Sequence, residues 1–243
     1  MPYRRLPNTD NARLKALKIA ITKGKEIPPF KLAFKQGTLI KVQSLLPSYE
    51  NMLSEHKNAY NLQVEKSKDH TVAMKKAKMY ISHFIHVINM SVQRGDMSPA
   101  IRNYFGLEEN VKKLPSLSTD EEILSWGTKL MEGEKKRLMK GMSPITNPTI
   151  AVVRIYCDRF AEACNFQNGL KKRLERAQSS LGAARNEADS VIQQLWNEIE
   201  DTFKDLPEEL KRKKASEYGV VYVFRKNELK GINLLKASHY EIG

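Results

Sequence analysis

Two stretches of this 243-residue chain carry apolar side chains at steps of three and four residues. That spacing places the side chains on one face of an α-helix, and a seam averaging 3.5 residues is typical of long helices packed in a bundle. The first seam consists of Leu39, Val42, Leu46, Tyr49, Leu53, His56, Tyr60, Met74, Ala77, Ile81, Phe84 and Ile88. The second consists of Ile150, Val153, Cys157, Phe160, Cys164, Leu174, Leu181, Ala188, Ile192, Leu195 and Ile199.

A polar centre interrupts each seam, at 63–70 in the first and at 165–169 in the second. An unbroken helix through either stretch would be roughly 85–90 Å long at about 1.5 Å per residue, which exceeds the core of a domain of this size. We therefore expect each stretch to fold back as a helical hairpin, with Ser67 or Asp69 capping the second helix of the first hairpin. In the second hairpin Gly169 and Gly182 both qualify as the turn, and the choice stays open.

The two stretches also end alike, which indicates an internal repeat. Pro99 and Pro207 each stand where a short helix can begin, because proline is accepted in the first turn of a helix. Gly106 and Gly219 follow as suitable left-handed stops.

These patterns predict an all-α fold, namely an elongated antiparallel four-helix bundle built from two helical hairpins, with a small C-terminal β element. The predicted segments form one globular unit and are a basic arm with a short helix (1–30), the first hairpin (31–107), a connector with a strap helix (108–146), the second hairpin (147–219) and a β-like tail (220–243). Thr119 and Glu122 have the spacing of a capping box at the start of the strap helix. In the tail, the β-branched and aromatic run 220–224 predicts a strand, and 232–235 or 239–242 could return as its partner.

The basic residues are concentrated at the N-terminal end of the chain. Residues 1–80 hold 16 lysines and arginines against 6 acidic residues, and so carry most of the net charge of +13. An arm of this kind can bind the phosphates of a polyanion, or its lysines can simply be solvated while Leu14, Leu17 and Ile21 pack on the bundle. The candidate polyanion-binding residues are Arg4, Arg5, Arg13, Lys15, Lys18, Lys23 and Lys25.

Two other sets of side chains are candidates for chemistry. His83 and His86 have the i, i+3 spacing that can place two imidazoles on one metal ion, but the helix lacks the inward glutamates of a di-iron bundle. Cys157 and Cys164 lie two helical turns apart, about 10 Å, too far for a disulfide with each other. We expect both cysteines to be small core residues.

The sequence contains no phosphate-binding glycine loop, nucleophile elbow or Cys-x-x-Cys pair, so we expect a non-enzymatic protein without cofactor, metal ligand or catalytic residue. It also has no run of about 18 apolar residues and no apolar leader at residues 1–10, so we expect no transmembrane segment and a cytoplasmic location.

Two terminal motifs carry a resemblance to a known group of proteins. They are the opening run 2–10, followed by Ala12-Arg13-Leu14 and Leu32-Ala33-Phe34, and the closing run 218–222. With these motifs the chain resembles a family of helical proteins of unknown function from Bacteroidetes, which implies a bacterial, cytoplasmic protein and no particular activity.

The function predicted from the sequence is that of a helical-bundle interaction or scaffold protein, which binds a protein partner or a second copy of itself. Long amphipathic helices without a catalytic constellation indicate this role. The alternative is a nucleic-acid-associated protein that uses the basic N-terminal third.

Overall fold

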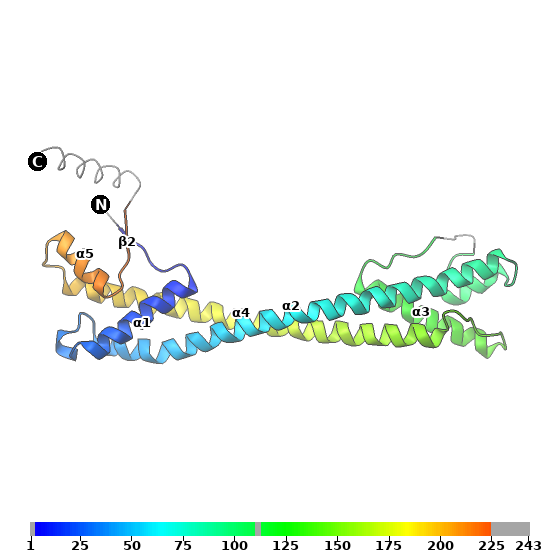
Figure 1. The fold of residues 1–243 in the computed structure, drawn as a ribbon, viewed down its shortest axis with the longest axis horizontal. Helices are drawn as coiled ribbons and strands as arrows, with labels where there is room; N and C mark the ends of the chain where they lie inside the picture. Colours follow the sequence, from blue (N-terminus) through cyan, green and yellow to red (C-terminus); the bar gives the residue numbers. More distant parts are fainter. Residues whose placement is uncertain (1–2, 110–112, 225–243) are drawn as a thin grey trace, which may run out of the picture. The chain divides into compact units, whose positions relative to one another are not determined.

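The computed structural model of the protein describes residues 3–109 and 113–224. The described chain is mostly helical, with one small antiparallel sheet, which confirms the predicted all-α class with a small β element (Figure 1). In chain order the elements are β1 (Tyr3–Arg4), α1 (Asp10–Glu26), the 3₁₀-helix η1 (Pro29–Lys31), α2 (Gln36–Gln93), the 3₁₀-helix η2 (Pro99–Phe105), α3 (Asp120–Met139), α4 (Ile150–Thr202), α5 (Glu208–Glu217) and β2 (Tyr222–Val223). None of the helices described is both long and apolar enough to cross a membrane.

The turn predicted in the first apolar stretch is wrong, because α2 continues as one helix through 63–70. This polar segment holds no glycine or proline, and its lysine, glutamate and glutamine residues are good helix formers. Lys66 pairs with Asp69 one turn later at 3.2 Å, and the Thr71 hydroxyl donates to the carbonyl oxygen of Ser67. Ser67 and Asp69 are therefore helix-interior residues and not caps.

The turn predicted in the second stretch is also wrong, because α4 runs unbroken past both glycines. Gly169 and Gly182 keep negative φ angles, and a side chain added at either would have nothing within 4 Å. Glycine in a helix interior costs only about 0.5–1 kcal/mol relative to alanine, too little to end a helix of this length. The hairpins therefore do not form, and long continuous helices take their place.

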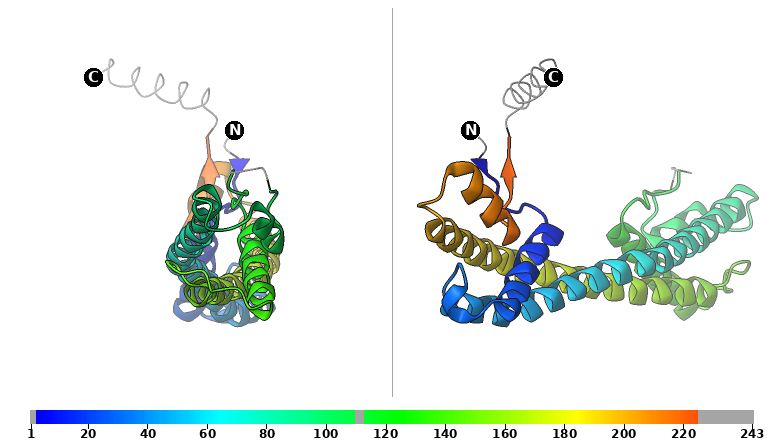
Figure 2. Two further views of the ribbon diagram at one scale, coloured as in Figure 1. Left: turned by 90° about the vertical axis from the view of Figure 1, so that its right-hand side faces the viewer. Right: turned by 60° about the vertical axis from the view of Figure 1, so that its left-hand side comes forward.

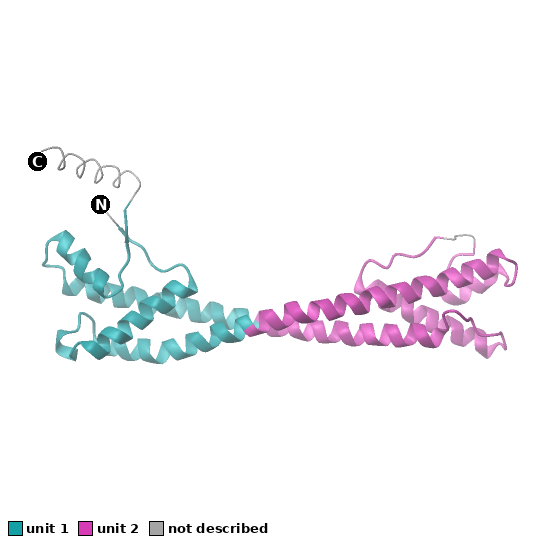
Figure 3. Ribbon diagram, viewed as in Figure 1, with its two compact units in different colours: residues 1–57, 176–243 teal, residues 58–175 magenta. Residues whose placement is uncertain are grey.

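The chain divides into two compact units, and neither corresponds to one copy of the predicted repeat. Unit 1 contains residues 1–57 and 176–243, and unit 2 contains residues 58–175 (Figure 3). Each unit thus combines part of α2 with part of α4, and these parts are more than 50 residues apart in the sequence.

The core of unit 1 brings together α1, α5, the beginning of α2 and the end of α4. Leu17, Val42, Ile192 and Ala215, one residue from each of these helices, belong to a single buried cluster. The two long helices are antiparallel in this unit, since the Thr38 hydroxyl near the start of α2 donates to Glu198 near the end of α4.

The core of unit 2 lies between α2, η2, α3 and the first part of α4. Ile81, Phe105, Ile123 and Phe160 come from these four elements and are fully buried in a second cluster. The pairing of the long helices is antiparallel here too, because Tyr80 of α2 stacks on Tyr156 of α4 with their ring centroids 4.2 Å apart. The strap helix predicted in the connector is α3.

The small sheet pairs the two ends of the described chain in unit 1. β2 forms where the sequence predicts a strand, but its antiparallel partner is β1, with Tyr3 opposite Val223 and Arg4 opposite Tyr222 (Figure 2). The Arg5 amide extends the pairing by donating to the carbonyl oxygen of Val221 at 2.9 Å. The predicted partner strands 232–235 and 239–242 lie outside the described residues.

Candidate functional site

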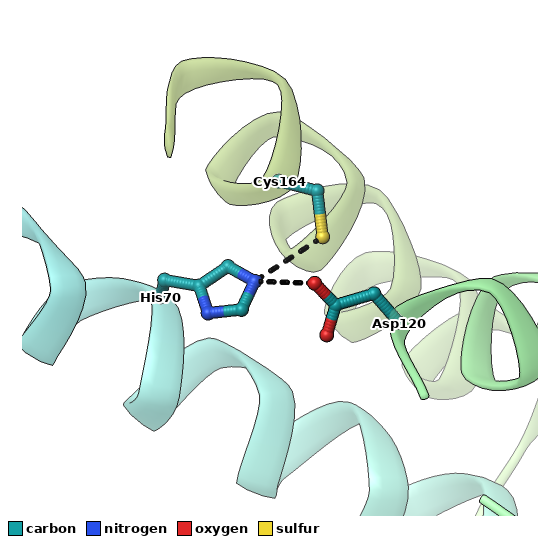
Figure 4. Close-up of side chains that lie close together, drawn as sticks. All are labelled: His70, Asp120 and Cys164. Carbon is teal, nitrogen blue, oxygen red and sulfur yellow. Dashed lines mark hydrogen bonds and ion pairs between the residues drawn. The ribbon is translucent and has the colours of Figure 1, made fainter. Parts of the chain in front are cut away.

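Three side chains of different chemistry converge in unit 2 from three helices. His70 comes from α2, Asp120 is the first residue of α3, and Cys164 comes from α4 (Figure 4). The Nε2 atom of His70 lies 3.0 Å from Oδ2 of Asp120 and 3.5 Å from Sγ of Cys164. The three atoms all lie within 4.8 Å of one another, and among the described residues they form the one such group of three potential metal ligands.

Local structure fixes two of these side chains in place. The Thr119 hydroxyl accepts from the amide of Glu122, and the Glu122 carboxylate accepts in return from the Thr119 amide, which completes the predicted capping box. This cap sets where α3 starts and therefore where Asp120 lies. On α2, the imidazole of His70 packs against the ring of Phe160 with centroids 5.5 Å apart, and Phe160 lies one turn before Cys164 on α4.

The three groups differ in their access to solvent. Cys164 is buried, the His70 side chain keeps 17 % of its surface exposed, and that of Asp120 keeps 46 %. Burial, followed by the charge of Asp120 and a hydrogen bond with it, raises the pKa of the Cys164 thiol to about 11. The thiol is therefore protonated near neutral pH and is a poor nucleophile.

The arrangement differs from that of a nucleophilic triad. In a triad the imidazole uses one nitrogen for the nucleophile and the other for the carboxylate that orients it. Here both dashed contacts in Figure 4 end on the same nitrogen of His70. Imidazole nitrogen, carboxylate oxygen and cysteine sulfur are all atoms to which transition-metal ions bind in proteins.

The sequence does not single out this cluster. His70 falls in the segment predicted as a turn, and Asp120 directly follows the predicted cap Thr119, where acidic residues are favoured. Cys164 is predicted to be a core residue, and its burial confirms this. No short motif connects the three, because they are 50 and 44 residues apart. The signal that could have found them is the antiparallel register of two unbroken helices, which places position 70 opposite position 164.

The other sequence candidates for metal binding lie apart from this site. His83 and His86 are exposed on α2, and they belong to no group of three potential ligands among the residues the structure describes. Cys157 is buried against Gly127 of α3, and burial raises the pKa of its thiol to about 11. Cys157 therefore has the core role expected of it.

Four of the seven basic-arm residues form ion pairs with carboxylates of unit 1. Arg13 donates two hydrogen bonds to Asp189, at 2.7 and 2.8 Å, and Arg4 donates to Glu200 at 2.8 Å. The Nζ atom of Lys18 lies 2.7 Å from Glu50, and that of Lys23 lies 3.0 Å from Glu26. The charge of these four cations is therefore compensated locally.

The remaining three arm residues, Arg5, Lys15 and Lys25, are exposed and form no ion pair with any residue that the structure describes. Arg5 and Lys15 line a pocket of about 390 Å³, together with apolar side chains of α1 and the loop after α5. The structure therefore places two of the seven candidates at one pocket and four in separate ion pairs, and Lys25 belongs to neither group among the described residues.

Comparisons with known proteins find no relative of this chain. The chain matches no protein-family model, no curated protein and no solved structure. The resemblance of its terminal motifs to Bacteroidetes proteins stays a prediction.

Proposed function

We propose that this protein is a non-enzymatic interaction protein whose helix α2 docks against a second copy of the same chain. The observation that carries the proposal is a second heptad-spaced stripe on α2, separate from the seam that faces the core. Its members are Val72, Met79, His83, His86 and Met90, all of them exposed.

The apolar members of this stripe are open to solvent. Val72 is 55 % exposed, Met79 is 42 % exposed and Met90 is 54 % exposed. The steps of seven, four, three and four between successive members keep them on one face of the helix, as in the docking face of a coiled coil. Lys76 shares this spacing, but its ammonium group turns aside and lies 5.9 Å from the centre of the Tyr156 ring.

A second copy fits this stripe because the order of residue types along it is nearly the same from either end. When two copies of α2 pack antiparallel about a twofold axis near Ile81, Val72 of one faces Met90 of the other and Met79 faces His83. A twofold interface requires such self-complementarity, since the same patch must serve both partners. Imidazole and thioether groups also pack against apolar side chains without burying a full charge.

The chemistry at the His70 cluster supports a binding role over catalysis. The Cys164 thiol has a raised pKa of about 11, and His70 offers one nitrogen to both of its neighbours. An activated cysteine would require a lowered pKa and an imidazole that bridges it to the orienting carboxylate.

Sedimentation of the full-length protein over a wide concentration range tests the proposal. An interface of low area dissociates at micromolar to millimolar concentrations, so the range should extend from about 5 µM to about 500 µM. We expect a reversible monomer–dimer equilibrium for the wild type and a monomer for Met79→Glu over the whole range.

A matched control is Met139→Glu, which alters a methionine that is 74 % exposed at the end of α3. This variant should dimerise like the wild type. A wild type that stays monomeric at every concentration would overturn the proposal, and so would equal loss of the dimer in the two variants.

A further inference from the structure

We propose that His70, Asp120 and Cys164 bind one divalent transition-metal ion, for which Zn²⁺ is the best match. The ligand atoms would be Nε2 of His70, Oδ2 of Asp120 and Sγ of Cys164, one from each of the helices α2, α3 and α4. This site is independent of the exposed stripe proposed above for self-association.

The spacing of the three atoms is close to that of a tetrahedral ion. With bonds of about 2.0–2.1 Å to nitrogen and oxygen and about 2.3 Å to sulfur, ligand atoms in a tetrahedron lie roughly 3.3–3.8 Å apart. The observed separations are 3.0 Å between nitrogen and oxygen and 3.5 Å between nitrogen and sulfur, and the oxygen and sulfur lie within 4.8 Å of each other. Two of the three separations are thus within about 0.3 Å of the tetrahedral range.

The donor set selects for zinc among the common cations. A thiolate and an imidazole disfavour Mg²⁺ and Ca²⁺, which take oxygen ligands, and favour Zn²⁺, for which nitrogen and sulfur are the usual donors. Three protein ligands leave a fourth position for water. The exposure of Asp120 and His70 gives that position contact with solvent and the ion a path into the site.

Hydrogen bonds hold the three side chains together when no ion is bound. The Nε2 atom of His70 can either donate one hydrogen bond or accept one. When it donates, the Asp120 carboxylate is the acceptor. The sulfur of Cys164 approaches the same nitrogen at 3.5 Å, and its thiol forms a hydrogen bond with the Asp120 carboxylate. A cation would take the place of these protons and bind all three atoms directly, once the thiol has lost its proton to become a ligand.

The expected consequence of binding is structural. Asp120 opens α3, so an ion at this site would fasten the start of α3 to α2 and α4 inside unit 2. Since the ion would bind the folded chain and the three ligands are far apart in the unfolded one, it should raise the resistance of the protein to unfolding by mass action.

Cobalt is a suitable probe, because Co²⁺ occupies zinc sites and reports on its ligands by absorption. The full-length protein without an affinity tag would be stripped with a chelator and titrated with Co²⁺, then with Zn²⁺. We expect one Co²⁺ per chain, a dissociation constant below about 10 µM, the visible bands of a tetrahedral ion and a near-ultraviolet thiolate charge-transfer band. Zn²⁺ should displace the cobalt and raise the unfolding temperature.

Substitutions assign the ligands. Cys164→Ala should abolish the charge-transfer band, and Cys164→Ala and Asp120→Asn should each weaken binding at least tenfold. Two matched controls should bind like the wild type, namely Cys157→Ala, which removes the other buried thiol of α4, and His83→Gln combined with His86→Gln. Circular dichroism of each stripped variant establishes that it is folded, and Asp120→Asn, a conservative change at a half-exposed side chain, provides the test if Cys164→Ala does not fold.

Three outcomes would overturn the assignment. One is the absence of Co²⁺ and Zn²⁺ binding at about 100 µM metal, tenfold above the expected dissociation constant. Another is binding that persists unchanged in both Cys164→Ala and Asp120→Asn. The third is binding that disappears with the exposed histidines His83 and His86, which would place the ion elsewhere on α2.

Discussion

The carboxylate of Asp10 accepts two hydrogen bonds from the guanidinium of Arg185, with N···O distances of 2.8 and 2.6 Å. The hydroxyl of the buried Tyr49 donates to the same carboxylate at 2.7 Å. The hydrogen bond from Arg185 is the largest influence that holds the pKa of Asp10 below its usual value, against the opposing effect of burial. Asp10 thus joins the start of α1 to α4 and α2 within unit 1.

Replacing Asp10 with asparagine should lower the free energy of unfolding by on the order of 1–2 kcal/mol at neutral pH, since Arg185 is partly exposed and solvent screens the pair. Because the folded pKa lies below the unfolded one, this stabilisation is present above pH of about 4 and is lost as the pH falls through the folded pKa. In urea unfolding between pH 7 and pH 2, the free energies of unfolding of wild type and Asp10→Asn should therefore become equal in acid.

The control is Asp201→Asn, at an exposed site in α4, which should show neither the loss of stability nor its pH dependence. A difference in free energy between wild type and Asp10→Asn that is constant at all pH values would contradict the assignment.

Glu134 and Arg137 form an ion pair that is almost completely buried in unit 2. Glu134 also accepts from the amide of Ile145 at 2.8 Å, and Arg137 donates to the carbonyl oxygen of Ser143. Removing one partner leaves the other charge buried and unpaired, so Glu134→Leu should cost on the order of 3–5 kcal/mol in urea unfolding.

The double variant Glu134→Leu with Arg137→Met should be more stable than Glu134→Leu alone, because no unpaired charge remains. Glu132→Leu, at an exposed position on the same helix, is the control and should change the free energy of unfolding by less than about 0.5 kcal/mol. A double variant less stable than the single one would mean that the pair contributes more than charge compensation.

The glycines of α4 test the continuity of that helix. Alanine at Gly169 or Gly182 has open space for its Cβ, so each change should raise the free energy of unfolding by about 0.5–1 kcal/mol. If the chain turned at either glycine with a positive φ, as the sequence suggested, the same change would destabilise it.

Gly133 of α3 is the contrasting case. An added Cβ there would lie 2.5 Å from the backbone oxygen of Tyr104, which cannot rotate away as a side chain can. Gly133→Ala should therefore lower stability by about 1–3 kcal/mol. Equal effects of alanine at 133 and 169 would contradict this account of the packing.

Sequence patterns were reliable where the cause of a structure is local. The capping box of Thr119 and Glu122 forms as predicted, and Pro99 and Gly106 mark the beginning and the left-handed end of η2. Most of the apolar seam is buried too, although Tyr60 is exposed and Ala59 takes its place in the core. A residue at a position that the heptad spacing assigns to the core can thus be exposed while the residue next to it is buried.

The sequence patterns do not predict which segments far apart in the chain pack against each other. The polar centre of each stretch was interpreted as a turn because a seam shows which residues are apolar, and not whether a polar segment is a loop or a solvated helix. Because the predicted turns are wrong, the sequence does not predict which residues of α2 lie opposite which residues of α4. It therefore does not predict the contact between His70 and Cys164. The pairing of β1 with β2 was missed for the same reason, since two residues near one terminus carry no signal for a partner near the other.

The basic arm remains the basis of the alternative function, and its ion pairs limit how strongly it can bind nucleic acid. Arg4, Arg13, Lys18 and Lys23 are engaged with carboxylates, which leaves Arg5, Lys15 and Lys25 to contact phosphates. Because each phosphate contact contributes about −0.9 to the slope of log K against log salt on duplex DNA, the slope should be no steeper than about −3. Duplex binding at rising salt, from about 50 mM, measures this slope.

Replacing Arg5, Lys15 and Lys25 with glutamine should abolish the binding of nucleic acid. Glutamine at Lys211, Lys213 and Lys214, which removes the same charge from α5, should not abolish it. A slope near −6, or equal loss in both triple variants, would mean that net charge and not this arm attracts the nucleic acid.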